Sequence, residues 1–390
     1  MNKITKCGIS EATDFHSLWN LPKLPLTEQM GNFNPESLNY DQELVISIPT
    51  GHVQLKNQLS PEVLYTESDY SYRTSSAFSA ERGVIFFENV LKGVAENKKF
   101  ESIVDVGGND LSLMRRLSSY GKNRTVIDPV CKTIDGKTID GIKVFGRFIE
   151  EVNLSSDIKK PDLVICRHTM EHISRPKDVI EQWFKQCSDN CKYIIEIPCF
   201  ENLAESLRFD AIFHQHYHLF DLDSLKYLIW ECGGEYLSHT HYHQGSCGGS
   251  LIIAFKKAKS KQTKPEMSNL DEKIKYYERR INLFKNQMQV YSQLLKDLPR
   301  PIYGYGAGLM LATLGYHLKT DFTSFECILD DDLEKNDTGY KNIPVKIKTP
   351  SLENPPENAS YLITSMENLR PIYKRILELN PRRIISPLIS

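Results

Sequence analysis

Two short segments concentrate the histidines of this chain. The segment FHQHYHLF, residues 213–220, places a histidine at every second position, and HTHYHQ, residues 239–244, repeats the spacing. Together they hold six of the eleven histidines. If residues 213–220 are extended, His214, His216 and His218 share one face, because alternate residues of a strand do so. We favour a catalytic cleft over structural histidines, and structural histidines over a metal site.

A second group of residues predicts a cofactor loop. The stretch VDVGGNDLSLMRRL reads as a strand, a tight turn and a helix. Its glycines let the backbone adopt positive φ and approach a ligand closely. About 20 residues later, TVIDP ends the next strand with an aspartate, whose carboxylate can accept both hydroxyl protons of a ribose. The candidate cofactor-binding residues here are Asp105, Gly107, Gly108, Asn109, Asp110 and Asp128.

The charge of this loop indicates which cofactor it binds. A dinucleotide loop leaves room for a pyrophosphate at the helix N-terminus. Asp110 would repel a phosphate but suits the sulfonium and amino group of S-adenosylmethionine. Arg167 and His168, at the end of a later strand, are further cofactor-binding candidates. The alternative is that Asn109 or Asp110 only caps the helix, which would leave the other residues of the set unexplained.

The elements that position these groups alternate between strand and helix. From Glu81 to about Lys259, β-branched runs such as SIVDVGG, DLVICRH and KYIIEIP are separated by helical stretches. This alternation predicts a parallel sheet with helices on both faces. The predicted fold is therefore α/β, with a Rossmann-like domain between a small N-terminal lobe and a second C-terminal Rossmann-like α/β lobe. The predicted boundaries are 1–80, 81–260, 261–298 for a connecting helix, and 299–390.

The connecting helix and the C-terminal lobe carry two further patterns. Apolar residues from Leu270 to Leu295 follow a four-three spacing, which predicts a packing face inside the chain or a seam with a second copy. The loop YGYGAG and the later ILDDD form a weak dinucleotide fingerprint. We favour a structural turn over ligand binding for this loop.

Composition narrows the class of protein. A net charge of −2 provides no field that would attract nucleic acid or an anionic membrane. No apolar run reaches the roughly 20 residues needed to span a bilayer. Nine cysteines are an odd number scattered through apolar strings, which suits reduced thiols better than a disulfide framework. We expect a cytoplasmic protein that acts on a small molecule as a monomer or homodimer.

Together these motifs resemble the class I S-adenosylmethionine-dependent methyltransferases, and within them the sugar C-methyltransferases. The resemblance covers nearly the whole chain. It implies an N-terminal zinc-binding lobe, a methyl-donor domain and a C-terminal Rossmann-like lobe. It also implies methylation of a nucleotide-linked keto-deoxysugar at the carbon beside the carbonyl. The motifs that carry it are VDVGGND, DLVICRHTMEHI, EIP, RFDAIFHQHYHLF, CGGSL and YGYGAG with ILDDD.

The resemblance implies roles for individual residues. The family typically reads Tyr-His-Glu-His where this chain reads FHQH, and the final histidine is the base, so His216 inherits that role. His172, in HTMEH, matches an upstream histidine of the family. With His214 it is a candidate to orient the substrate or bind the developing oxyanion. The aromatic hydroxyl that the N-terminal lobe offers to the substrate points to Tyr70 or Tyr72.

The chain departs from the family pattern within the predicted cleft. Phe213 and Gln215 stand where tyrosine and glutamate are usual, and Leu111 stands where the cofactor loop has a third glycine. Phe213 and Gln215 remain substrate-binding candidates, together with His243 beside the GSCGGSL turn. O-methylation of a sugar hydroxyl is therefore an alternative, since it needs only a base and a positioned alcohol.

The zinc site that the family carries is largely absent. Of its two Cys-x-x-Cys pairs only Cys7 remains, with Ser47 and Thr50 in place of the second pair. One thiolate cannot hold a tetrahedral structural zinc. We therefore predict an N-terminal lobe that folds without metal, and no metal site elsewhere. The remaining alternatives are a metal-binding or regulatory protein with a decayed methyl-donor site and, more distantly, a nicotinamide oxidoreductase that uses YGYGAG.

Overall fold

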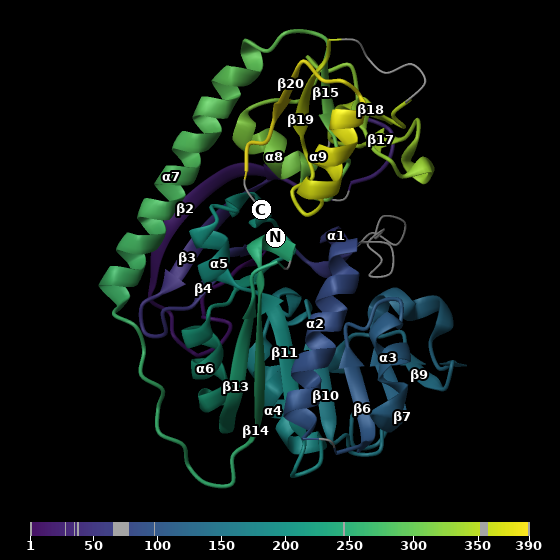
Figure 1. Cartoon of the computed structure of the whole chain (residues 1–390). Coiled ribbons are helices and arrows are strands. Elements are labelled where there is room, and N and C mark those ends of the chain that lie inside the picture. The colour runs from purple at the N-terminus through teal and green to yellow at the C-terminus, as the bar shows by residue number, and fades with distance from the viewer. Residues whose placement is uncertain are drawn as a thin grey trace.

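The computed structural model covers most of the chain, and its strands form several sheets joined by helices (Figure 1). The described residues are 2–27, 29–34, 36, 39–64, 78–96, 98–244, 246–351 and 358–388. Within them lie an eight-stranded, a six-stranded and a four-stranded sheet and one two-stranded pair. None of the helices in these ranges is long and apolar enough to cross a membrane.

The eight-stranded sheet has the order β13-β14-β11-β10-β6-β7-β9-β8. Its five central strands run parallel, whereas β8, β13 and β14 are antiparallel to their neighbours. The strands are β6 (Phe100–Val106), β7 (Gly121–Ile127), β8 (Thr138–Ile139), β9 (Ile142–Phe145), β10 (Leu163–Arg167), β11 (Lys192–Pro198), β13 (Gly234–Tyr242) and β14 (Ser250–Lys257). The order reverses beside β6, since β7 lies on one side and β10 on the other. Parallel α/β sheets bind ligands at such a reversal.

Helices cover both faces of this sheet. The covering helices are α2 (Phe78–Ala95), α3 (Ser112–Arg116), α4 (Pro176–Gln186) and α6 (Leu222–Glu231). Ile103 of β6 lies in one apolar cluster with Phe87 of α2 and Met114 of α3. Its neighbour Val104 lies in the opposite cluster with Trp183 of α4. Successive strand residues face opposite sides, so both faces are buried, and the predicted Rossmann-like α/β fold is confirmed.

The four-stranded sheet ties the histidine-rich segment to the N-terminal lobe. Its order is β12-β4-β3-β2, and β12 pairs His218 with Gln54 and Leu219 with Val53. Its strands are β2 (Phe15–Pro25), β3 (Asn39–Ser47), β4 (Val53–Leu55) and β12 (His218–Leu219), while β1 (Asn2–Lys3) and β5 (Asn57–Gln58) form the two-stranded pair. The short helix α1 (Pro61–Leu64) follows β5 in the chain, and α5 (Phe200–Glu205) precedes β12. A segment far along the chain thus completes the N-terminal sheet.

The long helix α7 (Leu270–Lys296) runs along the N-terminal sheet toward the C-terminal lobe (Figure 1). Its predicted apolar stripe packs inside the chain. The buried members are Tyr277, Ile281, Phe284, Met288 and Leu295, and Leu270, Ile274 and Tyr291 pack against the same cluster. The helix therefore joins the lobes by burying one face against both of them.

The C-terminal lobe repeats the α/β pattern. Its sheet has the order β17-β18-β16-β15-β19-β20, and all strands but β17 are parallel to their neighbours. The elements are β15 (Ile302–Tyr305), α8 (Leu311–Leu318), β16 (Ile328–Leu329), β17 (Gly339–Tyr340), β18 (Ile343–Lys348), β19 (Ser360–Ile363), α9 (Leu369–Glu378) and β20 (Arg383–Ile385). The predicted second Rossmann-like lobe is present.

Candidate active site

The loop after β6 has a backbone that side chains would disrupt. Gly107 has φ +81°, and a Cβ atom there would lie 1.8 Å from Thr169 Oγ1. A Cβ atom at Gly108 would lie 2.7 Å from Val126 Cγ1. Both positions therefore require glycine, and the backbone can approach a ligand closely. Leu111, where the resemblance leads us to expect glycine, adopts a left-handed φ of +64°, a conformation that glycine favours.

Asp128 fixes this loop to the end of β7. Its Oδ2 accepts a hydrogen bond from Asn109 N (2.8 Å), and its Oδ1 accepts one from Val130 N (2.9 Å). Burial raises the pKa of Asp128 above its usual range. Asp110 Oδ1 accepts a bond from Ser112 N (3.2 Å), so Asp110 also closes the turn into α3. Each carboxylate oxygen still has acceptor capacity, which a ribose or an amino group can use.

Asp105 lies behind the loop as a buried acid. Its side chain is 2% exposed, and Oδ1 has no hydrogen-bond partner among the described residues. Burial raises the pKa of Asp105 to about 7, with Arg167 opposing the shift and Asp128 adding to it. An unsatisfied buried carboxylate oxygen beside a glycine cradle fits a site that takes a hydrogen-bonding, cationic cofactor.

Arg167 and His168, at the end of β10, belong to a charged network. Arg167 Nε donates to Glu196 Oε2 (2.6 Å) at the end of β11. His168 has a left-handed backbone and lies 3.5 Å from Glu196 Oε1 and 3.8 Å from Glu171 Oε1. Burial lowers the pKa of His168, but Glu196 and Glu171 outweigh it and raise the pKa to about 9. The cation on His168 is thus held between two buried carboxylates.

Glu171 and Glu196 were not among the predicted site residues. Both side chains are 1% exposed, although charged groups are rarely buried unless they are paired. Burial tends to raise the pKa of Glu196, but Arg167 and His168 reverse the shift and lower it. The available signal was positional, since HTMEH directly follows the parallel strand β10 and EIP ends the parallel strand β11.

The histidine-rich segment turns instead of continuing as a strand. His216 N donates to Phe213 O (3.1 Å), which closes a turn. His214 lies against the N-terminal lobe, with Nε2 bonded to Leu24 O (2.9 Å) and Nδ1 to Gln42 (3.2 Å). His218 lies apart from His214, with its Nδ1 hydrogen-bonded to His52 Nε2 (3.0 Å). The prediction that the three histidines share one face is therefore wrong, because tertiary contacts bend the segment.

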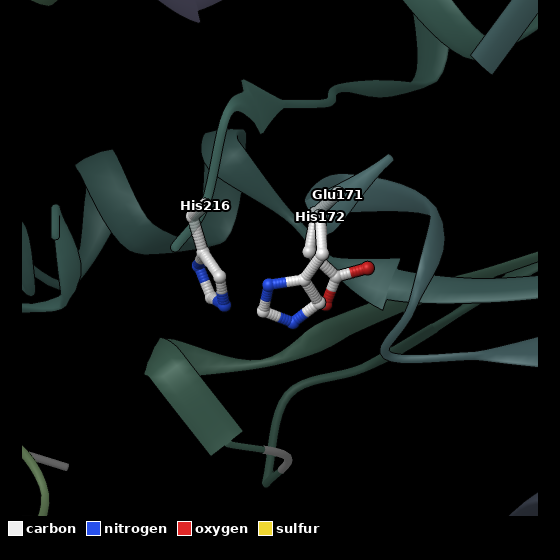
Figure 2. A group of neighbouring side chains, drawn as sticks. All are labelled: Glu171, His172 and His216. Carbon is white, nitrogen blue, oxygen red and sulfur yellow. The ribbon is translucent and has the colours of Figure 1, made fainter. Parts of the chain in front are cut away.

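His216 instead meets His172 and Glu171 (Figure 2). The ring centroids of His172 and His216 are 4.9 Å apart, and Phe213 packs 4.2 Å from the His216 ring. His172 Nδ1 donates to Gln215 O (2.8 Å), and its Nε2 lies 4.0 Å from Glu171 Oε1. Burial, with His172 and His168 adding to it, holds the pKa of His216 well below its usual range. His216 is therefore a neutral imidazole that can accept a proton.

Several predicted residues lie elsewhere. His243 is exposed just beyond β13, where its ring stacks 5.9 Å from that of His241. His241 Nδ1 lies 3.8 Å from Cys199 Sγ. The second histidine segment is therefore an edge-strand feature, and a substrate contact by His243 stays a prediction. Tyr70 and Tyr72 lie outside the described residues.

The place of the zinc site that the resemblance implies is taken by hydroxyl groups. Cys7 Sγ lies 3.6 Å from Thr50 Oγ1, and both residues are buried. Buried Ser47 Oγ has no hydrogen-bond partner in the described part of the chain. Backbone bonds from Ser10 N to Cys7 O and from Gly51 N to Ser47 O form two turns. One thiol with hydroxyls does not fit a structural zinc, so no role is assigned to the metal.

Comparison with known proteins gives one family match and several similar solved structures. Residues 79–239 match the family model described as a methyltransferase domain. A search of curated proteins found no match. The chain is similar to N-methyltransferase NodS from Bradyrhizobium japonicum WM9 in complex with S-adenosyl-L-homocysteine, at 12% identity over 49% of this chain and 94% of that one, with a TM-score of 0.38. It is also similar to 1,6-didemethyltoxoflavin-N1-methyltransferase from Burkholderia thailandensis, at 11% identity over 55% of this chain and 96% of that one, with a TM-score of 0.40.

Proposed function

We propose that this chain is an S-adenosylmethionine-dependent enzyme that methylates a sugar on carbon. The premise is that residues 79–239 form its methyltransferase domain. The acceptor class, a nucleotide-linked keto-deoxysugar, rests on the resemblance of the FHQH and HTMEH motifs. The observation that carries the proposal is a buried, neutral His216 beside His172 and Glu171. All nine cysteines are free thiols, which suits the cytoplasm that we propose as its compartment.

The chain holds the cofactor at the ends of β6 and β7. Asp128 accepts hydroxyl protons of the ribose, and the glycines at 107 and 108 bring the backbone close to the ligand. Asp110 adds a carboxylate to the loop, and Asp105 adds a buried carboxyl oxygen without a described partner, which can accept a hydrogen bond from an ammonium group. When bound, S-adenosylmethionine supplies a methyl group on a sulfonium sulfur for in-line transfer.

His216 removes the proton beside the carbonyl of the acceptor. A neutral imidazole is required for this step, and burial keeps His216 neutral. Once it has taken the proton, the ring is positive and Glu171 lies within 4.8 Å to stabilise it. His172 is held by Gln215 O with its ring 4.9 Å from that of His216, and from there it positions the acceptor oxygen. We infer no step for His214, because both of its ring nitrogens are bonded to other groups.

An isotope experiment tests carbon methylation. Nucleotide-linked keto-deoxysugars deuterated beside the carbonyl are incubated with the enzyme and S-adenosylmethionine, and the products are analysed by mass spectrometry. Carbon methylation replaces one deuterium with a methyl group at the labelled carbon. A product that carries the methyl group on oxygen and retains both deuterium atoms would contradict the proposal.

O-methylation of a sugar hydroxyl is the second candidate. Phe213, buried and packed on His216, provides no hydroxyl where the family has one, and Gln215 provides no carboxylate. A base and a positioned alcohol are still present. Retention of the deuterium label is the result that this candidate predicts.

A further inference from the structure

Glu171 is a buried carboxylate whose hydrogen bonds are not satisfied. Its side chain is 1% exposed, and neither Oε1 nor Oε2 has a hydrogen-bond partner within the ranges that the structure describes. Burying a charge without hydrogen bonds is costly unless a cation or metal compensates. His168 contributes one positive charge at 3.8 Å, but it also faces Glu196. Glu171 therefore has capacity for a second cation.

Two imidazoles converge on the same carboxylate. One ligand atom from each of Glu171, His172 and His216 lies within 4.8 Å of the other two (Figure 2). His172 donates its Nδ1–H to the backbone carbonyl of Gln215 (2.8 Å). Metal-bound histidines usually donate their second nitrogen to a carbonyl or carboxylate in this way, which fixes the lone pair on the other nitrogen. The lone pair of the His172 ring is thus on Nε2, which lies 4.0 Å from Glu171 Oε1.

We propose that Glu171, His172 and His216 bind one first-row divalent transition-metal ion, with zinc as the reference ion. Two imidazoles and one carboxylate form a common donor set for such ions and leave a coordination position open. Metal–ligand distances of about 2.0–2.2 Å place ligand atoms roughly 3.3–3.6 Å apart. Closing the present 4.8 Å span requires side-chain shifts on the order of 1 Å.

The ion and the reaction would compete for one lone pair. This consequence rests on the proposed function, in which His216 accepts a proton. A metal bound to the His216 lone pair prevents that step, so zinc should inhibit methyl transfer. S-adenosylmethionine affinity should change little, because the cofactor contacts assigned to Asp128 and Gly107 lie outside the ligand set.

Zinc binding to the full-length protein tests the site directly. The chelator-treated protein is titrated with zinc chloride in a calorimeter, and bound zinc is counted by mass spectrometry after dialysis. We expect one ion per chain in the wild type and at least a roughly tenfold weaker affinity in Glu171→Gln, consistent with losses at tuned metal sites. His216→Ala should give the same loss. Circular dichroism and thermal unfolding identify any variant that does not fold.

The matched control uses the other histidine-rich segment. His239 and His241 lie on β13, with ring centroids 5.7 Å apart, and are the rival imidazole site. The double variant His239→Ala/His241→Ala should bind zinc as the wild type does. The proposal is overturned if the wild type binds no zinc, or if binding is lost in this double variant and retained in folded Glu171→Gln.

The same samples separate this proposal from the proposed function. Turnover by chelator-treated wild type together with no zinc binding overturns the metal site and leaves His216 as the base. Zinc binding that depends on Glu171, together with full turnover by metal-free His216→Ala, overturns the assigned base and supports the metal site. Inhibition by zinc that Glu171→Gln relieves supports the competition between ion and proton.

Discussion

The loops after β6 and β15 use one backbone arrangement in two lobes. Gly107 N donates to Ile127 O (2.8 Å), and Gly306 N donates to Leu329 O (2.7 Å). In each case the accepting carbonyl belongs to the residue before an aspartate that ends the next strand. Both glycines have positive φ, +81° and +101°. The two lobes therefore close the turn between their first two strands in the same way.

The aspartates after the second strands also make matching bonds. Asp128 accepts from Asn109 N (2.8 Å) in the loop and from Val130 N (2.9 Å) two residues on. Asp330 accepts from Ala307 N (2.7 Å) in its loop and from Asp332 N (3.0 Å), also two residues on. The backbone alone thus gives no reason for one loop to bind a cofactor and the other not.

Charge is where the loops differ. The carbonyl of Asn109 accepts from the neutral thiol of Cys131 (3.1 Å). The corresponding carbonyl of Ala307 accepts from Lys335 Nζ (3.0 Å), which also lies 3.4 Å from Asp330 Oδ2. Lys335 therefore lies against the aspartate of its own loop, whereas in the first loop the cation, Arg115, donates to the backbone carbonyl of Asp110 (2.8 Å). A shared backbone fixes the geometry, and the side chains decide what can occupy it.

The largest difference between the lobes should appear in turnover when one histidine of each lobe is replaced. His216→Ala should reduce turnover by about 10²–10⁴-fold, the usual contribution of a general base, with cofactor affinity nearly unchanged. His317, in α8 of the C-terminal lobe, is the control, because it is half-buried and packs against the rings of Trp19 and Phe284. His317→Ala should lower stability and leave kcat unchanged below its unfolding temperature. Steady-state kinetics and cofactor calorimetry measure both variants, and equal losses of turnover would make His216 a structural residue.

The two lobes should also differ in how their stability depends on pH, because they carry different residues two positions before the loop glycine. The first lobe has Asp105 there, and the C-terminal lobe has Gly304. Burial raises the pKa of Asp105 to about 7, so the folded state holds this proton more tightly than the unfolded state. Stability should therefore fall as pH rises from about 4 to above 7, by on the order of a few kcal/mol.

Asp105→Asn removes this contribution and tests it. Denaturant unfolding at pH 5 and pH 8 should show a smaller decrease in stability for the variant than for the wild type. Asp331→Asn is the control, because Asp331 is half-exposed and pairs with Arg375 at the surface. An Asp105→Asn variant with the wild-type decrease would mean that other groups cause it.

The loop aspartates should differ in their effect on the cofactor. Asp128→Ala should weaken S-adenosylmethionine binding by about 1–3 kcal/mol, the usual effect of leaving a partner unpaired. Asp330→Ala, which breaks the matching bonds in the C-terminal loop, should leave this affinity unchanged. Calorimetry with the cofactor measures both. Weakening of equal size in the two variants would show that the effect reports loop stability and not contact with the ligand.

The sequence predicts the sheet well because strand ends are marked locally. Gly107 and Pro198 end apolar runs, and the structure places β6 and β11 at those runs. The helical stripe of α7 is equally local, since its period alone defines the buried face. Such signals need no knowledge of distant contacts. The fold class could therefore be inferred from the chain alone.

The arrangement of the candidate site depends on contacts that are distant in sequence. The spacing of His214 and His216 indicates a strand, but bonds from His214 to Leu24 and Gln42 bend the segment. The unsatisfied carboxylate of Glu171 is likewise visible only once the lobes are assembled. A motif can thus place a residue near the site without showing what it faces.

The smallest expected effect concerns the cation of the C-terminal loop. Lys335→Met keeps the aliphatic stem but removes the bonds to Ala307 O and Asp330, so stability should fall by about 0.5–1.5 kcal/mol. S-adenosylmethionine affinity should not change, because the first loop is untouched. Thermal unfolding and calorimetry provide the two readouts. If Lys335→Met instead changes cofactor affinity while Asp330→Ala does not, the charge of Lys335 acts on the bound cofactor. The electrostatics of the two loops would then not be independent. If stability alone changes, Lys335 acts only within its own loop.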